Sequence, residues 1–239
     1  MLASWNRSLE LAYFNQYLMT KVNKEKQVNW LLVDLGLEEK VAEDHINQVL
    51  DCMLIGFNRL FKYKCIKQAS LGYFRMLDIW KSGDGYHPRI HILLPTIKSY
   101  FQGRYYIKYD NWISLWSKAL SAESNVSVKV KVINDKVDNH TIISKMKKGI
   151  LAFHDVSNKK TSTGKNTLIA SRRLIGYSRL LKEVMDETVA GGDFALDLDQ
   201  LCIEDTIANA AFENMIEWHP GVRSENRNPF FSYNKSLIS

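Results

Sequence analysis

Residues 71–95, LGYFRMLDIWKSGDGYHPRIHILLP, contain two apolar runs separated by a short polar turn. The runs 71–80 and 85–95 are rich in aromatic and branched side chains, which favour strands. The intervening KSGDG, residues 81–85, predicts a turn because its glycines tolerate a positive φ. The sequence therefore predicts a β-hairpin, and the flanking segments decide what kind of sheet this hairpin joins.

The flanking segments alternate between helical and strand-like periodicity. Apolar residues recur at helical spacing in three of them, and two others show continuous or alternating apolar runs. The predicted helices cover 6–26, 38–61 and 109–120, and the predicted strands cover 28–37 and 125–135. After the first helix, the order is that of the split βαβ, ferredoxin-like arrangement. We therefore expect an α+β protein with an antiparallel sheet, helices on one of its faces, extra N- and C-terminal helices, and a second face free for a ligand.

The C-terminal part of the chain is patterned less clearly. Residues 171–187 show helical spacing, and this places Tyr177 on the apolar side of a predicted helix, where we interpret it as a core residue. The remainder is acidic and is expected to pack loosely. The predicted organisation is thus one domain over 4–185, followed by an acidic appendage over 186–239.

Charge is distributed unevenly between these two parts. The chain has a net charge of +6, whereas residues 186–239 contain 10 Asp and Glu against 3 Lys and Arg, so residues 1–185 carry +13. A basic body suggests a polyanionic partner, although a charge excess also serves solubility alone.

Two other features limit the function classes. No apolar run approaches the ~20 residues of a membrane helix, and the N-terminus lacks the pattern of a secretory signal. The three cysteines, Cys52, Cys65 and Cys202, are odd in number and far apart, which disfavours a disulfide framework or a cysteine-based zinc site. We therefore expect a cytoplasmic protein without a membrane partner.

The strand 85–95 carries the candidate metal ligands. Residues 87, 89 and 91 of a strand face the same way, but His87 and His91 are then roughly 13 Å apart, too far to hold one ion unless Pro88 bends the chain. Arg89 lies between them, and its permanent charge repels a metal. Asp78 on the other hairpin strand could approach His91, and together they could bind Mg²⁺ or Mn²⁺. The alternative is that His91 is a hydrogen-bonded residue of the sheet.

Basic residues near aromatic ones are the candidate nucleic-acid contacts. Arg104 and Lys108 alternate with tyrosines and Phe101 in residues 100–109, a pattern in which rings can stack on bases while cations hold phosphates. Further basic candidates are Arg89, Lys145, Lys147 and Lys148.

Five stretches of this sequence resemble, in order and spacing, the rolling-circle plasmid replication initiators of Gram-positive type, which belong to the HUH endonuclease superfamily. The stretches are WNRSLELAYFNQ, WLLVDLGL, FNRLFKYKCIKQASLGYFRMLDIW, GYHPRIHILLPTIKSYFQGRYYIKYDNWISLWSKAL and RRLIGYSRLLKEV. The resemblance covers roughly residues 4 to 185. It implies binding of a plasmid origin and nicking of one strand by a tyrosine that stays linked to the 5′-phosphate, assisted by a metal on a His-hydrophobe-His strand.

This sequence departs from the family pattern at the positions that carry the chemistry. The first motif histidine falls on Arg89, the second on His91, and the acidic residue of the preceding strand on Asp78. The nucleophilic tyrosine falls on Met146, whose thioether cannot attack a phosphate. A Cys-x-x-Cys pair that precedes the first matched stretch in the family is absent, as it would be after N-terminal truncation.

Three functions remain open at this stage. The chain is either a strand-cleaving plasmid replication initiator that uses Mg²⁺ or Mn²⁺, or an inactive relative that binds single-stranded or hairpin DNA of the origin. A host helicase would be a further partner of either. The third alternative, an unrelated ferredoxin-like module that binds RNA, does not explain the ordered sequence matches.

Overall fold

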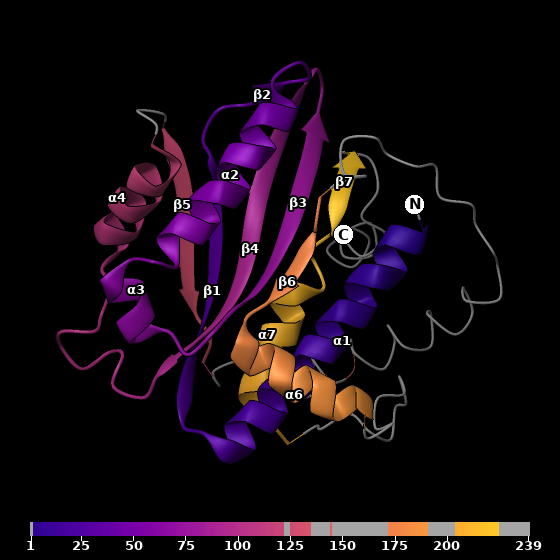
Figure 1. Ribbon diagram of the computed structural model, residues 1–239. Coiled ribbons are helices and arrows are strands. Elements are labelled where there is room, and N and C mark those ends of the chain that lie inside the picture. The colour runs from indigo at the N-terminus through magenta and orange to yellow at the C-terminus, as the bar shows by residue number, and fades with distance from the viewer. Residues whose placement is uncertain (1, 122–124, 135–143, 145–171, 191–203, 225–239) are drawn as a thin grey trace, which may run out of the picture.

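The computed structural model describes residues 2–121, 125–134, 144, 172–190 and 204–224 (Figure 1). Helices and strands alternate along the first half of the chain, as the periodicity predicts. The elements are α1 (Leu2–Glu25), β1 (Val28–Leu37), β2 (Val41–Ala42), α2 (Ile46–Leu60), α3 (Lys64–Ala69), β3 (Phe74–Ser82), β4 (Gly85–Ile97), α4 (Tyr109–Leu120), β5 (Val126–Val132), β6 (Ile175–Tyr177), α6 (Arg179–Ala190), α7 (Thr206–Met215) and β7 (Gly221–Ser224). No described helix has a stretch apolar and long enough to cross a bilayer.

One sheet organises these elements, with the strand order β5-β1-β4-β3-β6. The pairs β1–β4, β1–β5 and β3–β4 are antiparallel, which confirms the predicted ferredoxin-like arrangement and the α+β class. Three short strands extend it: β2 pairs with β4, β6 pairs antiparallel with β3, and β7 pairs with β3 in the parallel sense. The last two strands come from the C-terminal part of the chain.

The hairpin of β3 and β4 forms as the sequence predicts. Ser82 pairs with Gly85, and Gly83 at the tip has a φ of +62°, which a side chain would disfavour. The register is fixed along the whole hairpin, from Ser82 to Phe74 opposite Leu93. Each side chain of one strand therefore has a defined neighbour on the other.

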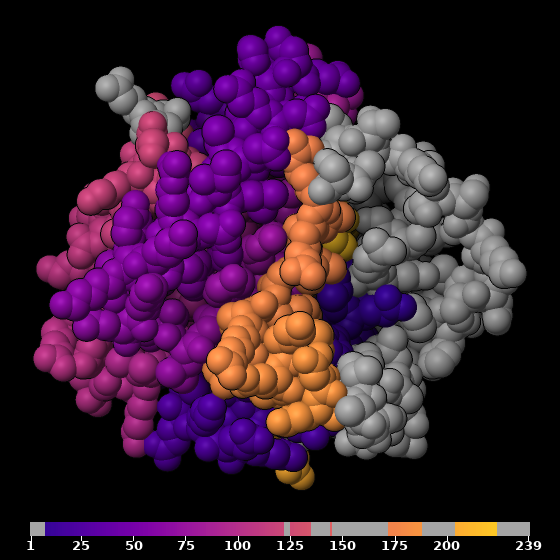
Figure 2. Space-filling view, in the orientation of Figure 1, coloured from indigo at the N-terminus to yellow at the C-terminus, as the bar shows by residue number. Residues whose placement is uncertain are grey.

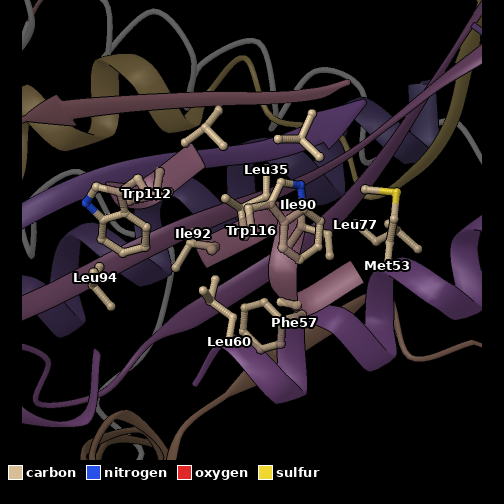
Figure 3. Packing of buried hydrophobic residues seen from close by; sticks show 14 of the residues in the cluster. Leu35, Met53, Phe57, Leu60, Leu77, Ile90, Ile92, Leu94, Trp112 and Trp116 are labelled. Atoms are coloured by element: carbon tan, nitrogen blue, oxygen red, sulfur yellow. The ribbon is translucent and has the colours of Figure 1, made fainter. Parts of the chain in front are cut away.

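One face of the sheet is closed by α2, α3 and α4, which lie together on the same side of the strands in Figure 1. The side chains between them are mainly apolar, although Arg75 of β3 lies over the Phe57 ring, and Figure 3 shows Phe57 and Leu60 of α2 packed near Ile90 and Ile92 of β4. The buried Trp116 of α4 also donates its indole N–H to the Gly36 carbonyl oxygen at 3.0 Å. This face of the sheet is thus covered by an apolar core.

The second face was expected to stay open, and this expectation is wrong for half of it. Helices α1, α6 and α7 pack there on Trp30 and Leu32 of β1 and on Phe74 of β3. In Figure 1, α7 passes behind β6 and lies beside α1. At this end of the sheet, the strands carry apolar side chains on both faces, so each face needs a layer of helices to cover it.

Two predicted helices have different boundaries in the structure. The predicted helix 38–61 begins only at Ile46, because Val41 pairs with Tyr86 and extends the sheet. The acidic residues of 38–44 therefore lie outside the helix. Helix 171–187 begins at Arg179, because residues 175–177 pair with β3. Sheet pairing outweighs weak helical periodicity in both segments.

The expected loose packing of the tail is also wrong for residues 206–224. Ala208, Ala211 and Phe212 of α7 are fully buried against α1, and Asp205 caps this helix by accepting from the Ala208 N–H at 2.9 Å. In the space-filling view of Figure 2, β6 and α6 form a surface strip between the α2 side of the molecule and α1. The C-terminal segments are therefore part of the sheet and its cover.

Candidate functional site

Strand register places two rows of polar side chains on the half of the second face that α1 and α7 do not cover. Directly paired residues of neighbouring strands point to the same face, so the pairing defines each row. The first row is Lys129, Asp34 and His91, on β5, β1 and β4; the second is Ser127, Arg89 and Asp78, on β5, β4 and β3. Two of the predicted metal ligands, His91 and Asp78, are thereby brought together.

His91 is the centre of this cluster and is held by two carboxylates. Its Nδ1 bonds to an Asp34 oxygen, and its Nε2 lies 3.2 Å from Oδ2 of Asp78. Burial alone would lower the pKa of His91, whose residue is 6% exposed, but the hydrogen bonds and charges of Asp34 and Asp78 raise it to about 9. His91 is therefore an imidazolium at neutral pH and donates from both nitrogens.

Asp34 is the more accessible carboxylate of the two. Burial raises its pKa, but the hydrogen bond and charge of His91 and the charges of Arg89 and Lys129 together hold the pKa of this carboxyl below its usual value. Its side chain keeps part of its surface exposed, whereas Asp78 is buried. The cluster thus has one solvent-facing and one interior carboxylate.

The C-terminal segment closes the cluster from above. Arg223 of β7 donates from Nε to Oδ1 of Asp78 at 3.1 Å, and its Nη2 lies 3.0 Å from Oδ2, a bidentate pair. The Trp218 indole stacks on the His91 ring, with centroids 4.9 Å apart and planes inclined by 9°. Arg223 and Trp218 therefore cover the two side chains that were expected to hold a metal.

The donor set of this cluster does not fit a divalent ion. Arg223 already engages both Asp78 oxygens, Oδ1 through a hydrogen bond and Oδ2 through an ion pair, and a guanidinium is effectively always charged, so it repels a cation. Asp34 bonds to the opposite nitrogen of His91 and does not converge with Asp78. Within the described ranges, no group of three or more His, Cys, Asp or Glu side chains could hold a metal ion. Arg223 therefore already neutralises the carboxylate that an ion would need.

His87 and Arg89 lie on the same face but outside this centre. His87 stacks near Trp80 of β3, with ring centroids 5.3 Å apart, and Pro88 introduces no bend, since β4 runs unbroken from Gly85 to Ile97. Arg89 turns away from its cross-strand neighbour Asp78 and donates to the Ser127 hydroxyl at 3.3 Å. The structure therefore does not place His87 beside His91.

No tyrosine in the described part of the chain is hydrogen-bonded to His91 or Asp78. Tyr177 lies at the end of β6 rather than on a helix, and its hydroxyl lies 3.3 Å from Oδ1 of Asn15 in α1. Burial raises the pKa of Tyr177, which disfavours a phenolate nucleophile. Met146, Lys145, Lys147 and Lys148 lie outside the described residues.

The predicted DNA contacts Arg104 and Lys108 lie on the other side of the sheet from His91. Both are exposed in the connection between β4 and α4, and α4 packs on the apolar face. Arg104 lies over the Tyr105 ring, 4.7 Å from its centroid. Of the predicted basic contacts that the structure describes, only Arg89 shares a face with His91.

Three residues that contact His91 or Asp78 directly were not predicted from the sequence. Asp34 had a signal, because it is the one charged residue within the apolar run 28–37 and shares the alternation of Trp30 and Leu32. Trp218 and Arg223 had none, since each lies more than a hundred positions from its partner, and β7 is too short to show a pattern.

Comparisons with known proteins place the chain among replication proteins. A model of the family described as Replication protein matches residues 2–226. The protein called Protein rep from Bacillus amyloliquefaciens is 32% identical over a region covering 93% of this chain and 73% of its own length. A second Protein rep, from Bacillus sp, is also 32% identical, over 80% and 69% of the two chains. The Replication protein of Staphylococcus aureus is 26% identical over 84% of this chain and 93% of its own.

Proposed function

This chain belongs to the replication protein family, and from that premise we propose that this plasmid replication protein, of rolling-circle type, binds single-stranded or hairpin DNA of the plasmid origin in the cytoplasm without cutting it. The observation that supports binding is the chemistry of the half of the second face that α1 and α7 do not cover. Trp80 is 37% exposed there and is paired with Arg223 across β3 and β7, and Arg89 and Lys129 lie on the same face on β4 and β5. An exposed ring can stack on a base while the cations hold the backbone phosphates.

The ion pair between Arg223 and Asp78 supports the second part of the proposal. Strand cleavage of the kind the resemblance implies needs an electrophile that polarises the phosphate and a nucleophile that attacks it. Arg223 fills both oxygens of Asp78, and Arg89 stands where the first motif histidine would be. A guanidinium can bind a phosphate bidentately without activating a nucleophile. Arg89, which lies beside this pair and donates to the Ser127 hydroxyl, accordingly offers a guanidinium to a backbone phosphate.

A binding assay tests the first part. We expect short fluorescent single-stranded and stem–loop DNA to raise the anisotropy on titration with the full chain, with an affinity that falls steeply between about 50 and 200 mM salt. Arg89→Ala should weaken binding, and Arg179→Ala, an exposed arginine paired with Glu183 on α6, serves as the matched control. Absence of binding at low salt, or a preference for RNA of the same sequence, would contradict the proposal.

Cleavage is the second candidate function, because a histidine and a carboxylate from neighbouring strands meet in this centre, with His91 Nε2 3.2 Å from Oδ2 of Asp78. The ion pair of Arg223 with Asp78 argues against it, since the guanidinium competes with a cation for this carboxylate. Incubation of the full chain with supercoiled origin plasmid and Mg²⁺ or Mn²⁺ tests this alternative. We expect no nicked circles and no covalent protein–DNA adduct, from the parent chain or from Arg223→Ala. Nicking by the parent chain would replace our proposal with the active initiator.

A further inference from the structure

A pocket of about 290 Å³ lies between α3, α4 and the connection that precedes α4, on the opposite side of the sheet from His91. Its volume is at the lower end of the roughly 300–1,000 Å³ of small-molecule sites. The helices contribute Cys65 and Gln68 from α3 and Asn111, Ser114 and Leu115 from α4. The connection contributes Arg104, Tyr105, Tyr106 and Ile107. The DNA contacts proposed above lie on the second face of the sheet and do not include this pocket.

The lining combines three kinds of group that a nucleotide needs. Gln68 and Asn111 carry uncharged amides and Ser114 a hydroxyl, which can pair with the donors and acceptors on a base edge. Tyr106 is 47% exposed, so a large aromatic surface remains available at the rim. Arg104 provides a charge for phosphate beside these groups.

The charges near the pocket favour an anion. Lys64 and Lys67 are exposed on the same short helix as Cys65 and Gln68, and Lys108 is exposed at the start of α4. Asp110, also exposed, is the acidic residue in the first turn of α4 and opposes this tendency. The three lysines near the pocket therefore outnumber this one neighbouring carboxylate.

We propose that this pocket binds one unpaired nucleotide of a DNA strand, with the base against Tyr106 and the amides of Gln68 and Asn111, and the phosphate on Arg104. The inference rests on the proposed function, since it assigns a second contact to the same DNA partner. A paired base cannot enter, because its hydrogen-bonding edge and its two faces are already engaged in the duplex. The pocket therefore confers a preference for single-stranded or looped DNA, which the charged half of the second face alone would not give.

Two cysteines make the proposal directly measurable. Cys65 lines the pocket and Cys52 lies outside it on α2, and both thiols are free and exposed. We expect saturating single-stranded DNA to slow alkylation of Cys65 by N-ethylmaleimide at least several-fold, read peptide by peptide in a mass spectrometer. Alkylation of Cys52 should keep its rate, and duplex DNA of the same sequence should protect neither thiol.

A pair of variants provides a second readout. Tyr106→Ala should weaken binding of single-stranded DNA by about tenfold, within the range of a lost base–aromatic stack, and should not affect duplex binding. Ile55→Ala removes an apolar side chain of similar exposure, 50%, on α2 outside the lining, and should leave the affinity unchanged.

The outcomes separate this proposal from the one on which it rests. If DNA binds but Cys65 stays as reactive as before, or if duplex protects it equally, the pocket assignment is wrong and the DNA-binding function stands. Equal losses in the Tyr106 and Ile55 variants would also overturn the assignment. If no DNA binds at all, the proposed function itself fails.

Discussion

The two faces of the central sheet are built from the same strands but differ in chemistry. On the face under α2 and α4, the buried strand residues are mainly apolar, from Leu31, Val33 and Leu35 of β1 to Ile90 and Ile92 of β4. On the other face, the same strands are apolar only near α1 and α7, and become polar from Asp34 and His91 onward. A strand alternates its side chains between the faces, so a single sequence specifies both surfaces.

This difference shows where the fold tolerates chemistry that costs stability. An ion pair with a buried carboxylate, such as that of Arg223 and Asp78, contributes little net stability once desolvation is counted, whereas apolar burial contributes about 1.5–3 kcal/mol per large side chain. The closed face can therefore stabilise the protein while the other face holds charged groups at a fixed spacing. Predictions on both faces test this division.

The largest effect is expected on the closed face. Trp116→Ala removes a fully buried indole and its hydrogen bond to Gly36, and should lower the free energy of unfolding by about 3–5 kcal/mol. Urea unfolding followed by circular dichroism measures this loss. Trp116→Phe keeps most of the volume and should cost clearly less. A loss below about 1 kcal/mol for the alanine variant would mean that this face is not the main core.

The pH dependence of stability tests the polar face. The pKa of His91 is raised to about 9 from 6.5, so its contribution to stability is fully present below about pH 6.5 and is lost as the pH rises through 9. We expect up to about 3 kcal/mol of stability to disappear over this range. Urea unfolding from about pH 6 to 10 measures it.

His91→Gln is the control for this pH dependence, because other titrating groups cancel in the difference between the two chains. Its unfolding free energy should approach that of the parent chain as the pH rises. A constant difference from pH 6 to 10 would show that the two aspartates do not raise the pKa of His91 in the folded protein. An NMR titration of the ring tests the same pKa if the variant does not fold.

A smaller effect is expected where α2 meets α4. A Cβ at Gly56 would lie 2.8 Å from Cδ2 of Leu120 and 3.2 Å from Cζ3 of Trp116. Alanine is the better helix former by about 1 kcal/mol, but overpacking costs about 1–3 kcal/mol, so Gly56→Ala should destabilise by up to about 2 kcal/mol. Chemical denaturation in the Leu120→Ala background supplies the control, because the nearest atom is then gone. An equal cost in both backgrounds would contradict this packing.

The sequence predicts the closed face better than the polar one, for a physical reason. Periodicity identifies the hairpin 71–95, helix 109–120 and strand 125–135, because local spacing alone determines which side chains can share a face. It fails at 175–177, where pairing with β3 overrides a helical pattern. Contacts between distant segments leave no periodic trace, so the covers formed by α7 and β7 could not be expected.

The candidate site shows the same limit. Asp78 and His91 were predicted to be neighbours because hairpin pairing is local, and the structure places Oδ2 of Asp78 3.2 Å from Nε2 of His91. Arg223, which decides the chemistry of Asp78, lies 145 positions away and pairs through a parallel strand. Its place depends on the tertiary fold, and only the assembled sheet reveals it.

The smallest effect on stability is expected at Lys129, which is exposed beside Asp34 on the polar face. Lys129→Ala should change the free energy of unfolding by less than about 0.5 kcal/mol, because it removes no buried contact. Anisotropy titrations should nevertheless show weaker binding of single-stranded DNA, with a slope of log K against log salt reduced by about 0.7 for one lost phosphate contact. Lys118→Ala is the matched control, since this exposed lysine lies on α4, across the sheet from Lys129. An unchanged salt slope for Lys129→Ala, or an equal change in both variants, would mean that Lys129 on the polar face does not contact a DNA phosphate.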